Sequence, residues 1–456
     1  MEKFDTIIIG SGAGGLSIGV LLSHRKPRDK VLVLEKNSGI GGRMWGGPGR
    51  DGFKSEIGCH MSSTTSRGTI GDILRIAGTE DQVQYTYARP MTMYKGKLFA
   101  FPRGLQGMVP ERDFRQLTAM YQEMMSLHPS AVAELDEVDF CSYVHRFTDN
   151  QVLHSILAHL CHIFSVVSYA KTSTGEFLRF LQTEARSRAT GYPIGGFVSI
   201  ANAMAEGIRK AGGVIRTNAK VEKILIEGGV AKGVVAGGKT YLADTIISNA
   251  DIKHTVRDLI GEQNLDQEYA RHIRDLEFSL SVIILRLALD KKVVDWPYIN
   301  WVGGDEPIDY HRKLEAGKVP NNLNLFMPCP SNLDPGMAPA GKQLINALVA
   351  GIPIDVQDVD GFKDAMLDTL QDFIPNLKKH LMWVEVTAPR DIDKFVGEQG
   401  AAIGVAQTVT QAGKNRPSIR TPIPNLYICG AETGGWGEGT ELAVESARSL
   451  FMMLYR

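Results

Sequence analysis

The chain has 456 residues, of which 43% are hydrophobic and 22% are charged, which excludes a disordered chain and leaves room for two or three domain-sized units. Its 50 basic and 51 acidic residues give a formal net charge of −1, so no nucleic-acid partner is expected. The 48 glycines are unevenly distributed and cluster in short motifs, several of them near the two ends of the chain.

The first predicted element is a buried strand over Phe4 to Ile9, which runs directly into a glycine-rich turn. Gly10, Gly12 and Gly15 stand at G-x-G-x-x-G spacing, and a helix is expected over Leu16 to Leu22. In such a motif the first glycine permits a tight turn and the second lets a pyrophosphate approach the backbone. The third lets the helix pack closely on the strand, and the helix N-terminus favours phosphate.

A second strand, Val31 to Leu34, ends at Glu35, twenty residues after Gly15. A carboxylate at this position can accept hydrogen bonds from the adenosine ribose and disfavours a 2′-phosphate. A second glycine cluster begins at Gly39 and ends at Arg43. This cluster suits a loop folded back over the pyrophosphate, with the arginine as a charged contact.

These residues resemble the glutathione-reductase-type FAD fold, in the branch of phytoene desaturases, carotenoid isomerases, retinol saturases, protoporphyrinogen oxidases and amine oxidases. In that branch a GGR motif follows the ribose acid, as Gly41, Gly42 and Arg43 do here. A "dGf…D.G.h" stretch comes next, here Asp51 to His60, with Glu56 where an aspartate is usual.

The resemblance implies an α/β fold in which a Rossmann-like FAD-binding domain, a parallel sheet with helices, holds an inserted mixed α+β substrate domain. The discontinuous FAD-binding domain is expected to comprise residues 1–60, 191–255 and 400–456. The substrate-binding domain is then expected to comprise residues 61–190 and 256–399.

The middle of the chain carries a further likeness. Gly191 to Gly196 resembles the "yPkGG" stretch of phytoene-desaturase-like proteins, with Ile194 in place of the basic or polar residue. A helix with one apolar face is expected next, followed by strands over residues 214–217, 221–226, 230–235 and 241–248. In the resembled family the strand at Val221 gives backbone contacts to the adenine; an ordinary strand position is the alternative.

The segments 60–190 and 255–400, which resemble the substrate portion of the family, are predicted in less detail. Leu153 to Tyr169 predicts an apolar helix that either lines a lipophilic tunnel or belongs to the core. The apolar stretch Ile156 to Ala170 contains His159 and His162 and falls short of the roughly 20 residues of a membrane span, so no transmembrane helix is expected. Buried strands are expected over Ser279 to Leu289 and Gln343 to Ala350, whereas residues 303–340 are expected to be rich in loops.

Near the C-terminus, a strand over Asn425 to Gly430 leads into a glycine-rich loop and then a helix that begins near Thr440. This layout matches the last FAD motif of the resembled family, in which a helix N-terminus points at the flavin ring. Glu432 is the candidate ribityl contact, although the family's acid often stands one residue earlier, at Ala431. Glu441 stands where desaturases usually have proline, and the "ELAVESA" helix is closer to amine oxidases.

The resemblance therefore implies FAD as the cofactor, held by Gly10, Gly12, Ala13, Gly14, Gly15, Glu35, Lys36, Gly42, Arg43, Val221, Glu432 and Leu442. No catalytic acid or base is assigned. His60, Tyr192 and Trp436 lie in or beside motifs near the expected flavin, but each is more often a packing residue.

The five cysteines are odd in number and include no C-x-x-C pair. This pattern favours free thiols in a reducing, cytoplasmic compartment over a disulfide framework or a zinc site, so no metal is predicted. It also excludes the disulfide-reductase branch of the fold. Contact with a membrane surface stays open.

Three functions are compatible with these motifs. The first is an FAD-dependent oxidoreductase of desaturase, isomerase or saturase type, acting by hydride transfer on C–C bonds of a small lipophilic polyene or isoprenoid. The second is a flavoenzyme of amine-oxidase or protoporphyrinogen-oxidase type, and the third is a non-enzymatic scaffold that keeps the FAD fold. No second G-x-G-x-x-G follows a strand, so electrons are expected to pass to or from an external carrier such as oxygen or a quinone rather than NAD(P)H.

Overall fold

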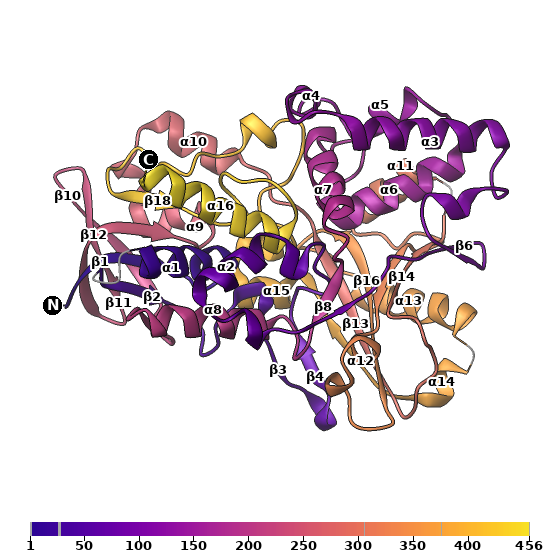
Figure 1. Ribbon diagram of the computed structural model, residues 1–456, viewed down its shortest axis with the longest axis horizontal. Helices are drawn as coiled ribbons and strands as arrows, with labels where there is room; N and C mark the ends of the chain where they lie inside the picture. Colours follow the sequence, from indigo (N-terminus) through magenta and orange to yellow (C-terminus); the bar gives the residue numbers. More distant parts are fainter. Residues whose placement is uncertain (1, 26–28, 305, 375, 456) are drawn as a thin grey trace.

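The computed structural model describes residues 2–25, 29–304, 306–374 and 376–455. Two seven-stranded sheets organise this part of the chain, with a group of helices beside them (Figure 1). We call them the first sheet and the second sheet. The strands of the first sheet are β1 (Glu2–Ile9), β2 (Val31–Leu34), β9 (Val214–Arg216), β10 (Val221–Glu227), β11 (Val230–Ala236), β12 (Lys239–Ser248) and β18 (Leu426–Ile428).

The first sheet has the order β10–β11–β12–β1–β2–β9, and β18 pairs with β12 off this path. Its centre is parallel: β1 pairs with β2 and with β12, β2 with β9, and β12 with β18. Successive residues of β1 alternate between faces, so Ile8 joins one core while Ile7 and Ile9 join the other. Both faces are therefore buried, as the apolar run in β1 predicts.

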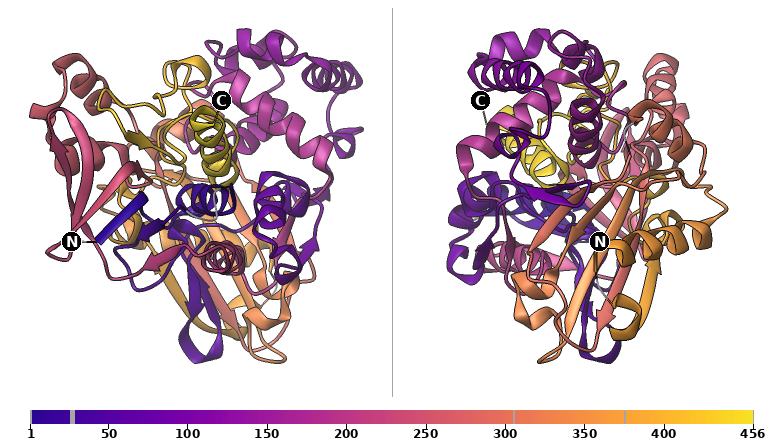
Figure 2. Two further views of the ribbon diagram at one scale, coloured as in Figure 1. Left: turned by 60° about the vertical axis from the view of Figure 1, so that its left-hand side comes forward. Right: turned by 90° about the vertical axis from the view of Figure 1, so that its right-hand side faces the viewer.

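Helices cover both faces of the first sheet. The core on the side of Ile8 is closed by α1 (Ala13–Arg25), α2 (Thr69–Ala77), α8 (Val198–Lys210) and α16 (Gly439–Leu454). The opposite core is closed by α9 (Ile252–His254), a π-helical turn (Thr255–Gly261) and α10 (Gln267–Asp275). The first helix α1 and the last helix α16 lie side by side, so segments from opposite ends of the sequence meet on this face (Figures 1 and 2).

The second sheet has the order β17–β13–β16–β15–β14–β6–β7 and is antiparallel except for the β14–β6 pair. Its strands are β6 (Thr92–Tyr94), β7 (Lys97–Phe99), β13 (Ser281–Leu289), β14 (Tyr298–Val302), β15 (Leu325–Pro328), β16 (Gln343–Ile352) and β17 (Leu381–Thr387). Its core includes residues of α11 (Pro307–Glu315), α13 (Val359–Phe373) and α14 (Leu377–His380). The short helix α12 (Pro330–Leu333) contacts β16, and α15 (Pro389–Val396) contacts β13.

A helical unit with its own core lies beside the second sheet, at the upper right of Figure 1. It comprises α3 (Glu111–Ser126), α4 (Pro129–Glu134), α5 (Phe140–His145), α6 (Gln151–Ser165) and α7 (Thr174–Ser187). Two short ribbons complete the fold: β3 (Gly46–Pro48) with β4 (Lys54–Glu56), and β5 (Tyr85–Tyr87) with β8 (Gly191–Pro193).

The strands predicted from the sequence are present, but the predicted end of one helix needs correction. The apolar helix ends at Ser165 and not at Tyr169, because Val166 adopts a left-handed conformation with φ of 52°. Residues 303–340 are rich in loops, as predicted, and the loops connect α11, β15 and α12. Helices α2 and α10 pack on the first sheet, although the predicted boundaries assign both to the substrate-binding domain; the domain division itself stays a prediction.

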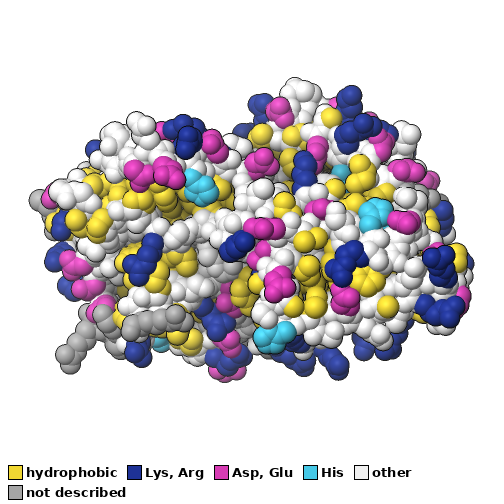
Figure 3. Space-filling model, turned by 90° about the horizontal axis from the view of Figure 1, so that it is seen from above, with side chains coloured by type: hydrophobic (Ala, Val, Ile, Leu, Met, Phe, Trp, Pro, Cys, Tyr) yellow, Lys and Arg dark blue, Asp and Glu magenta, His cyan; other side chains and the backbone are white. Residues whose placement is uncertain are grey.

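On the face seen in Figure 3, basic and acidic side chains are interspersed, and no large patch of one charge sign is present there. Among the helices of the described residues, none is both long and apolar enough to cross a membrane.

Candidate cofactor and substrate site

A cavity of about 1530 Å³ extends from the carboxyl ends of β1 and β2 to helices α6 and α7. One part of its wall consists of the glycine-rich turn, Glu35, the loop around Arg43, and residues that follow β12 and β18. The other part consists of side chains from the helical unit and the second sheet. Open parallel sheets bind nucleotides at this edge, so the position agrees with the sequence argument.

The glycine-rich turn is packed so tightly that side chains do not fit. Gly10 has a φ of +92°, and a Cβ on Gly15 would lie 2.1 Å from the carbonyl oxygen of Gly10. A Cβ on Gly12 would lie 2.9 Å from Asn249 Oδ1, and one on Gly14 3.0 Å from Gly430 Cα. Gly10, Gly12, Ala13 and Gly14 line the cavity, whereas Gly15 does not: it lies where α1 packs on the end of β1.

The carboxylate of Glu35 is buried at the end of β2 and holds the same turn. It accepts hydrogen bonds from Ser11 N at 3.0 Å, from Ser11 Oγ at 2.6 Å and from Asn37 N at 2.8 Å. Glu35 and the exposed Lys36 both line the cavity, as does Val221 at the start of β10. Glu35, Lys36 and Val221, three of the predicted cofactor-binding residues, therefore all line the same cavity.

Arg43 lines the cavity, but its guanidinium already has protein partners. It pairs with Glu398 at 2.5 Å and donates to the carbonyl oxygen of Ala401 at 2.6 Å. Gly42 lies against the turn, since its Cβ would be 3.2 Å from Gly12 Cα. The sequence prediction missed Glu398, and the separation of 355 residues explains why.

Glu432 follows β18 and lines the cavity with its carboxyl group 4% exposed. Oε2 accepts a hydrogen bond from Ile252 N at 2.6 Å, while Oε1 is buried without a hydrogen-bond partner in the described residues. Burial, with the nearby Glu398 and Asp251 carboxylates, raises the pKa of Glu432 well above its usual value. A buried acceptor atom without a partner is a place for a ligand hydroxyl or a water molecule.

Asn249 joins the glycine-rich turn to the loop after β18 and was not singled out from the sequence. Its Oδ1 accepts from Gly15 N at 2.8 Å, and its Nδ2 donates to the carbonyl oxygen of Cys429 at 2.7 Å. The side chain therefore ties the start of α1 to the end of β18. Its place at the end of β12 was the only signal available in the sequence.

Leu442 stays a predicted cofactor contact, but its side chain lies apart from the cavity surface. It is fully buried in a small cluster with Val166 and Ile403 and does not line the cavity. Its neighbours Thr440, Glu441 and Ala443 do line it. The helical period of α16 turns Leu442 towards the core.

His60, Tyr192 and Trp436, the three residues expected near the flavin, differ in whether they line the cavity. His60 lines the cavity, and burial, with a contribution from Arg286, lowers its pKa to about 3, so its ring is neutral. Tyr192 is buried and donates to Glu56 Oε2 at 2.6 Å, and Trp436 is 37% exposed; neither lines the cavity.

The wall formed by the helical unit is mainly apolar. Helix α6 contributes four apolar side chains and two histidines at helical spacing, and α7 adds phenylalanines and leucine: Leu157, His159, Leu160, His162, Ile163, Phe164, Phe177, Phe180 and Leu181. The segment predicted either to line a lipophilic tunnel or to belong to the core contributes to the cavity wall and to the core, because Leu157 and Phe164 line the cavity and also belong to the core of the helical unit.

Three partly buried carboxyl groups interrupt this apolar wall near the start of α16. Glu441 accepts from Ser62 Oγ at 2.8 Å, Glu184 from Thr190 Oγ1 at 3.0 Å, and Glu438 from Ser63 Oγ at 3.3 Å. Loss of solvent contact is the main reason why the pKa of each carboxyl group is raised, and neighbouring carboxylates add to the rise for Glu184 and Glu438.

The cradle fits a dinucleotide. The glycine backbone is free of side chains where a pyrophosphate would approach, the N-terminus of α1 faces the cavity, and Glu35 lies at the end of the next strand. The unpartnered Oε1 of Glu432 lies further along the same cavity. These groups would hold the phosphates, the ribose and the ribityl chain of FAD, respectively.

Comparison with known proteins agrees with this reading. The family model of flavin containing amine oxidoreductases matches residues 13–449. The 4,4'-diapolycopen-4-al dehydrogenase of Metabacillus indicus is 27% identical over 263 residues, which are 56% of this chain and 52% of that protein, so the match spans about half of that relative. The 4,4'-diapophytoene desaturase (4,4'-diapolycopene-forming) of a Methylomonas species is 26% identical over 97% of this chain and 93% of that protein.

An oxidoreductase of Methanosarcina mazei has the same fold, with a TM-score of 0.78 and 20% identity over 99% of this chain and 100% of that one. The family model covers nearly the whole chain, and the glycine-rich turn, Glu35 and Glu432 all line the cavity. The chain therefore belongs to the family of flavin containing amine oxidoreductases, with FAD as its cofactor and oxidation–reduction as its class of chemistry.

Proposed function

We propose that this FAD-dependent oxidoreductase acts on C–C bonds of a lipophilic polyene or isoprenoid, as a desaturase, isomerase or saturase. The observation that carries the proposal is the continuity of the cavity, which leads from the dinucleotide cradle to an apolar wall on α6 and α7. A volume of about 1530 Å³ exceeds the roughly 300–1,000 Å³ of ordinary ligand pockets, so it has room for FAD and a second large molecule. The Methylomonas desaturase, similar over nearly its whole length, is named for a polyene product.

When bound, the flavin supplies hydride transfer. The protein contributes binding and exclusion of water. Side chains such as Leu160, Ile163 and Phe164 would bury the hydrocarbon, at roughly 25 cal/mol for each Å² of apolar surface removed from water. A neutral His60 lines the same cavity without placing a charge against an apolar substrate.

An amine-type substrate is the second candidate, and one observation favours it. Glu184, Glu438 and Glu441 line the cavity, and burial raises the pKa of each carboxyl group. A bound ammonium group would offset the cost of ionising a buried carboxyl. Replacement of Glu441 with glutamine separates the two candidates, since it should weaken turnover of an amine and leave turnover of a hydrocarbon nearly unchanged.

The polyene proposal is tested by narrowing the apolar part of the cavity. Leu160→Trp adds bulk to the cavity wall, whereas Ile76→Trp changes an exposed position on α2 and serves as the control. With polyene lipid in liposomes and no oxygen, Leu160→Trp should bleach the flavin more slowly than wild type at equal FAD content, and Ile76→Trp should match wild type. Equal rates for all three proteins would contradict the proposed substrate site.

An external electron carrier and contact with a membrane surface are part of the same proposal. The electron carrier would be external, with oxygen or a quinone as candidates, because the sequence holds no second dinucleotide motif after a strand. Delivery of a lipophilic substrate would be easiest from a membrane surface, so a co-sedimentation assay with liposomes tests the expected peripheral contact.

A further inference from the structure

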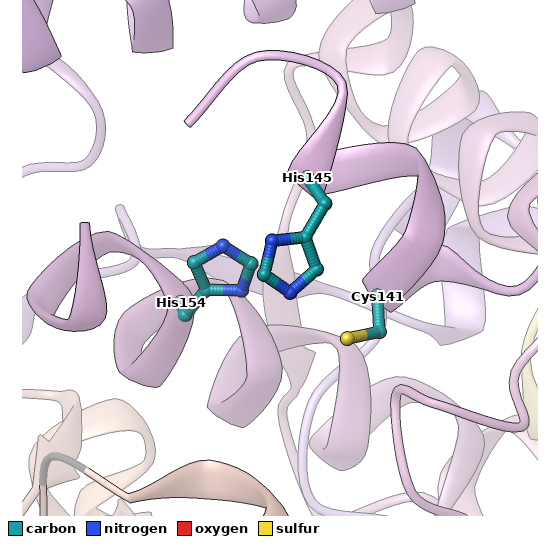
Figure 4. A group of neighbouring side chains, drawn as sticks. All are labelled: Cys141, His145 and His154. Atoms are coloured by element: carbon teal, nitrogen blue, oxygen red, sulfur yellow. The ribbon is translucent and has the colours of Figure 1, made fainter. Parts of the chain in front are cut away.

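A second cluster of chemically active side chains lies on the helical unit, away from the cavity. Cys141 and His145 stand four residues apart on α5, and His154 lies in the first turns of α6. Figure 4 shows the three side chains pointing towards one another. Their ligand atoms all lie within 4.8 Å of one another.

Hydrogen bonds determine which histidine nitrogens are available to a ligand. Nδ1 of His145 lies 2.8 Å from Asp149 Oδ1, and a carboxylate oxygen only accepts, so Nδ1 carries the proton. Nε2 of His154 lies 2.8 Å from the carbonyl oxygen of Thr148, so Nε2 carries the proton of that ring. In the neutral rings the lone pairs are therefore on Nε2 of His145 and Nδ1 of His154.

These outer contacts are those of histidine ligands in metal sites, where the nitrogen that does not bind the metal donates to a carboxylate or a backbone carbonyl. The Tyr169 hydroxyl lies 3.1 Å from Nδ1 of His154, and His154 would exchange this contact for the ion. The helix that carries His154 is fixed at its start, because Asn150 caps it and also donates to Asp113 at 2.7 Å.

We propose that Cys141, His145 and His154 bind one zinc ion or a similar borderline divalent cation. A thiolate with two imidazoles is a donor set that zinc prefers, and a water molecule would complete the tetrahedron. The Cys141 thiol gives its proton to solvent when the ion binds. Solvent reaches the site because the His145 side chain is 49% exposed and that of Asp149 is 90% exposed.

The ion would join α5 to α6, the helix that continues past His154 to the cavity residues Leu157 and Leu160. Its role would be to hold the outer end of this cavity helix. The sequence predicted no metal because the cysteines form no C-x-x-C pair, whereas here the fold brings ligands from two helices together.

The test uses the full-length protein loaded with FAD and titrated with cobalt(II), whose tetrahedral d–d bands lie at longer wavelengths than the flavin absorption. We expect one cobalt per chain, displaced by zinc, and a zinc-bound form with a higher melting temperature. Cys141→Ser and His154→Ala should abolish the bands, and Asp149→Asn should weaken binding roughly ten- to a hundredfold. His272→Ala, at an exposed histidine on α10, is the matched control and should bind as wild type does.

X-ray absorption of the wild-type zinc form gives an answer that depends on no variant. One sulfur at about 2.3 Å and nitrogen ligands at about 2.0–2.1 Å are expected. A zinc spectrum without sulfur, the absence of tetrahedral cobalt bands, or bands that persist in Cys141→Ser would each overturn the proposal.

Discussion

Replacing Glu35 with alanine removes a carboxylate that accepts three hydrogen bonds, two from Ser11 and one from Asn37. The side chain is only 5% exposed, so water replaces these bonds poorly, and the adenosine ribose loses a charged acceptor. A hydrogen bond to a charged group is worth about 1.5–3 kcal/mol, and about 1.4 kcal/mol is tenfold in an equilibrium constant. The affinity for FAD should therefore fall roughly ten- to a hundredfold.

FMN is the matched ligand for this test, because it lacks the adenosine half that Glu35 would contact. Apoprotein is titrated with each flavin, and binding is followed by the quenching of flavin fluorescence. Glu35→Ala should weaken FAD and leave FMN unchanged, and Glu227→Ala, at an exposed glutamate at the end of β10, should change neither. An unchanged FAD affinity, or an equal loss for both flavins, would refute the assignment of Glu35 to the ribose.

Three further predictions follow from the site. Asn249→Ala removes the bonds to Gly15 N and to the Cys429 carbonyl, so the free energy of unfolding in urea should fall by about 1–3 kcal/mol; an unchanged value would contradict the role of Asn249 as a clamp. Burial raises the pKa of Glu56 to about 7, so the folded state binds a proton that the unfolded state releases at lower pH, and stability is lost as the pH rises through this range. Glu56→Gln should flatten that loss between about pH 5 and about pH 8 in thermal melts, and an unaltered pH profile would count against it. NADH and NADPH should reduce the flavin slowly or not at all in anaerobic stopped-flow mixing, whereas reduction within seconds would reveal a nicotinamide site.

Local sequence predicted those parts of the site in which neighbours in the chain are also neighbours in space. The turn at Gly10, the carboxylate of Glu35 and the loop before α16 belong to this class, because fixed spacing brings each to the edge of a sheet. The long-range partners of Arg43 and Gly15 were missed. Glu398 meets Arg43 across 355 residues, and Asn249 meets Gly15 across 234, so only the folded chain reveals them.

Two positions could not be placed from the sequence pattern alone. Leu442, which stays a predicted cofactor contact, has a buried side chain, whereas its neighbours Thr440 and Glu441 line the cavity. The end of α6 was misplaced because Val166 adopts a left-handed conformation, which a β-branched residue seldom does. Tertiary packing decides both positions, and neither leaves a pattern in the sequence.

The central claim is that a flavin in the glycine cradle exchanges hydride with an apolar molecule held against α6 and α7. Anaerobic flavin absorbance tests this claim most directly, with polyene or isoprenoid lipids in liposomes in one arm and benzylamine-like or polyamine compounds in the other. The account predicts that the lipids bleach the oxidised flavin and that the amines leave it unchanged. Bleaching by amines with no response to lipids would contradict it and assign the cavity carboxyls Glu184, Glu438 and Glu441 to an ammonium substrate.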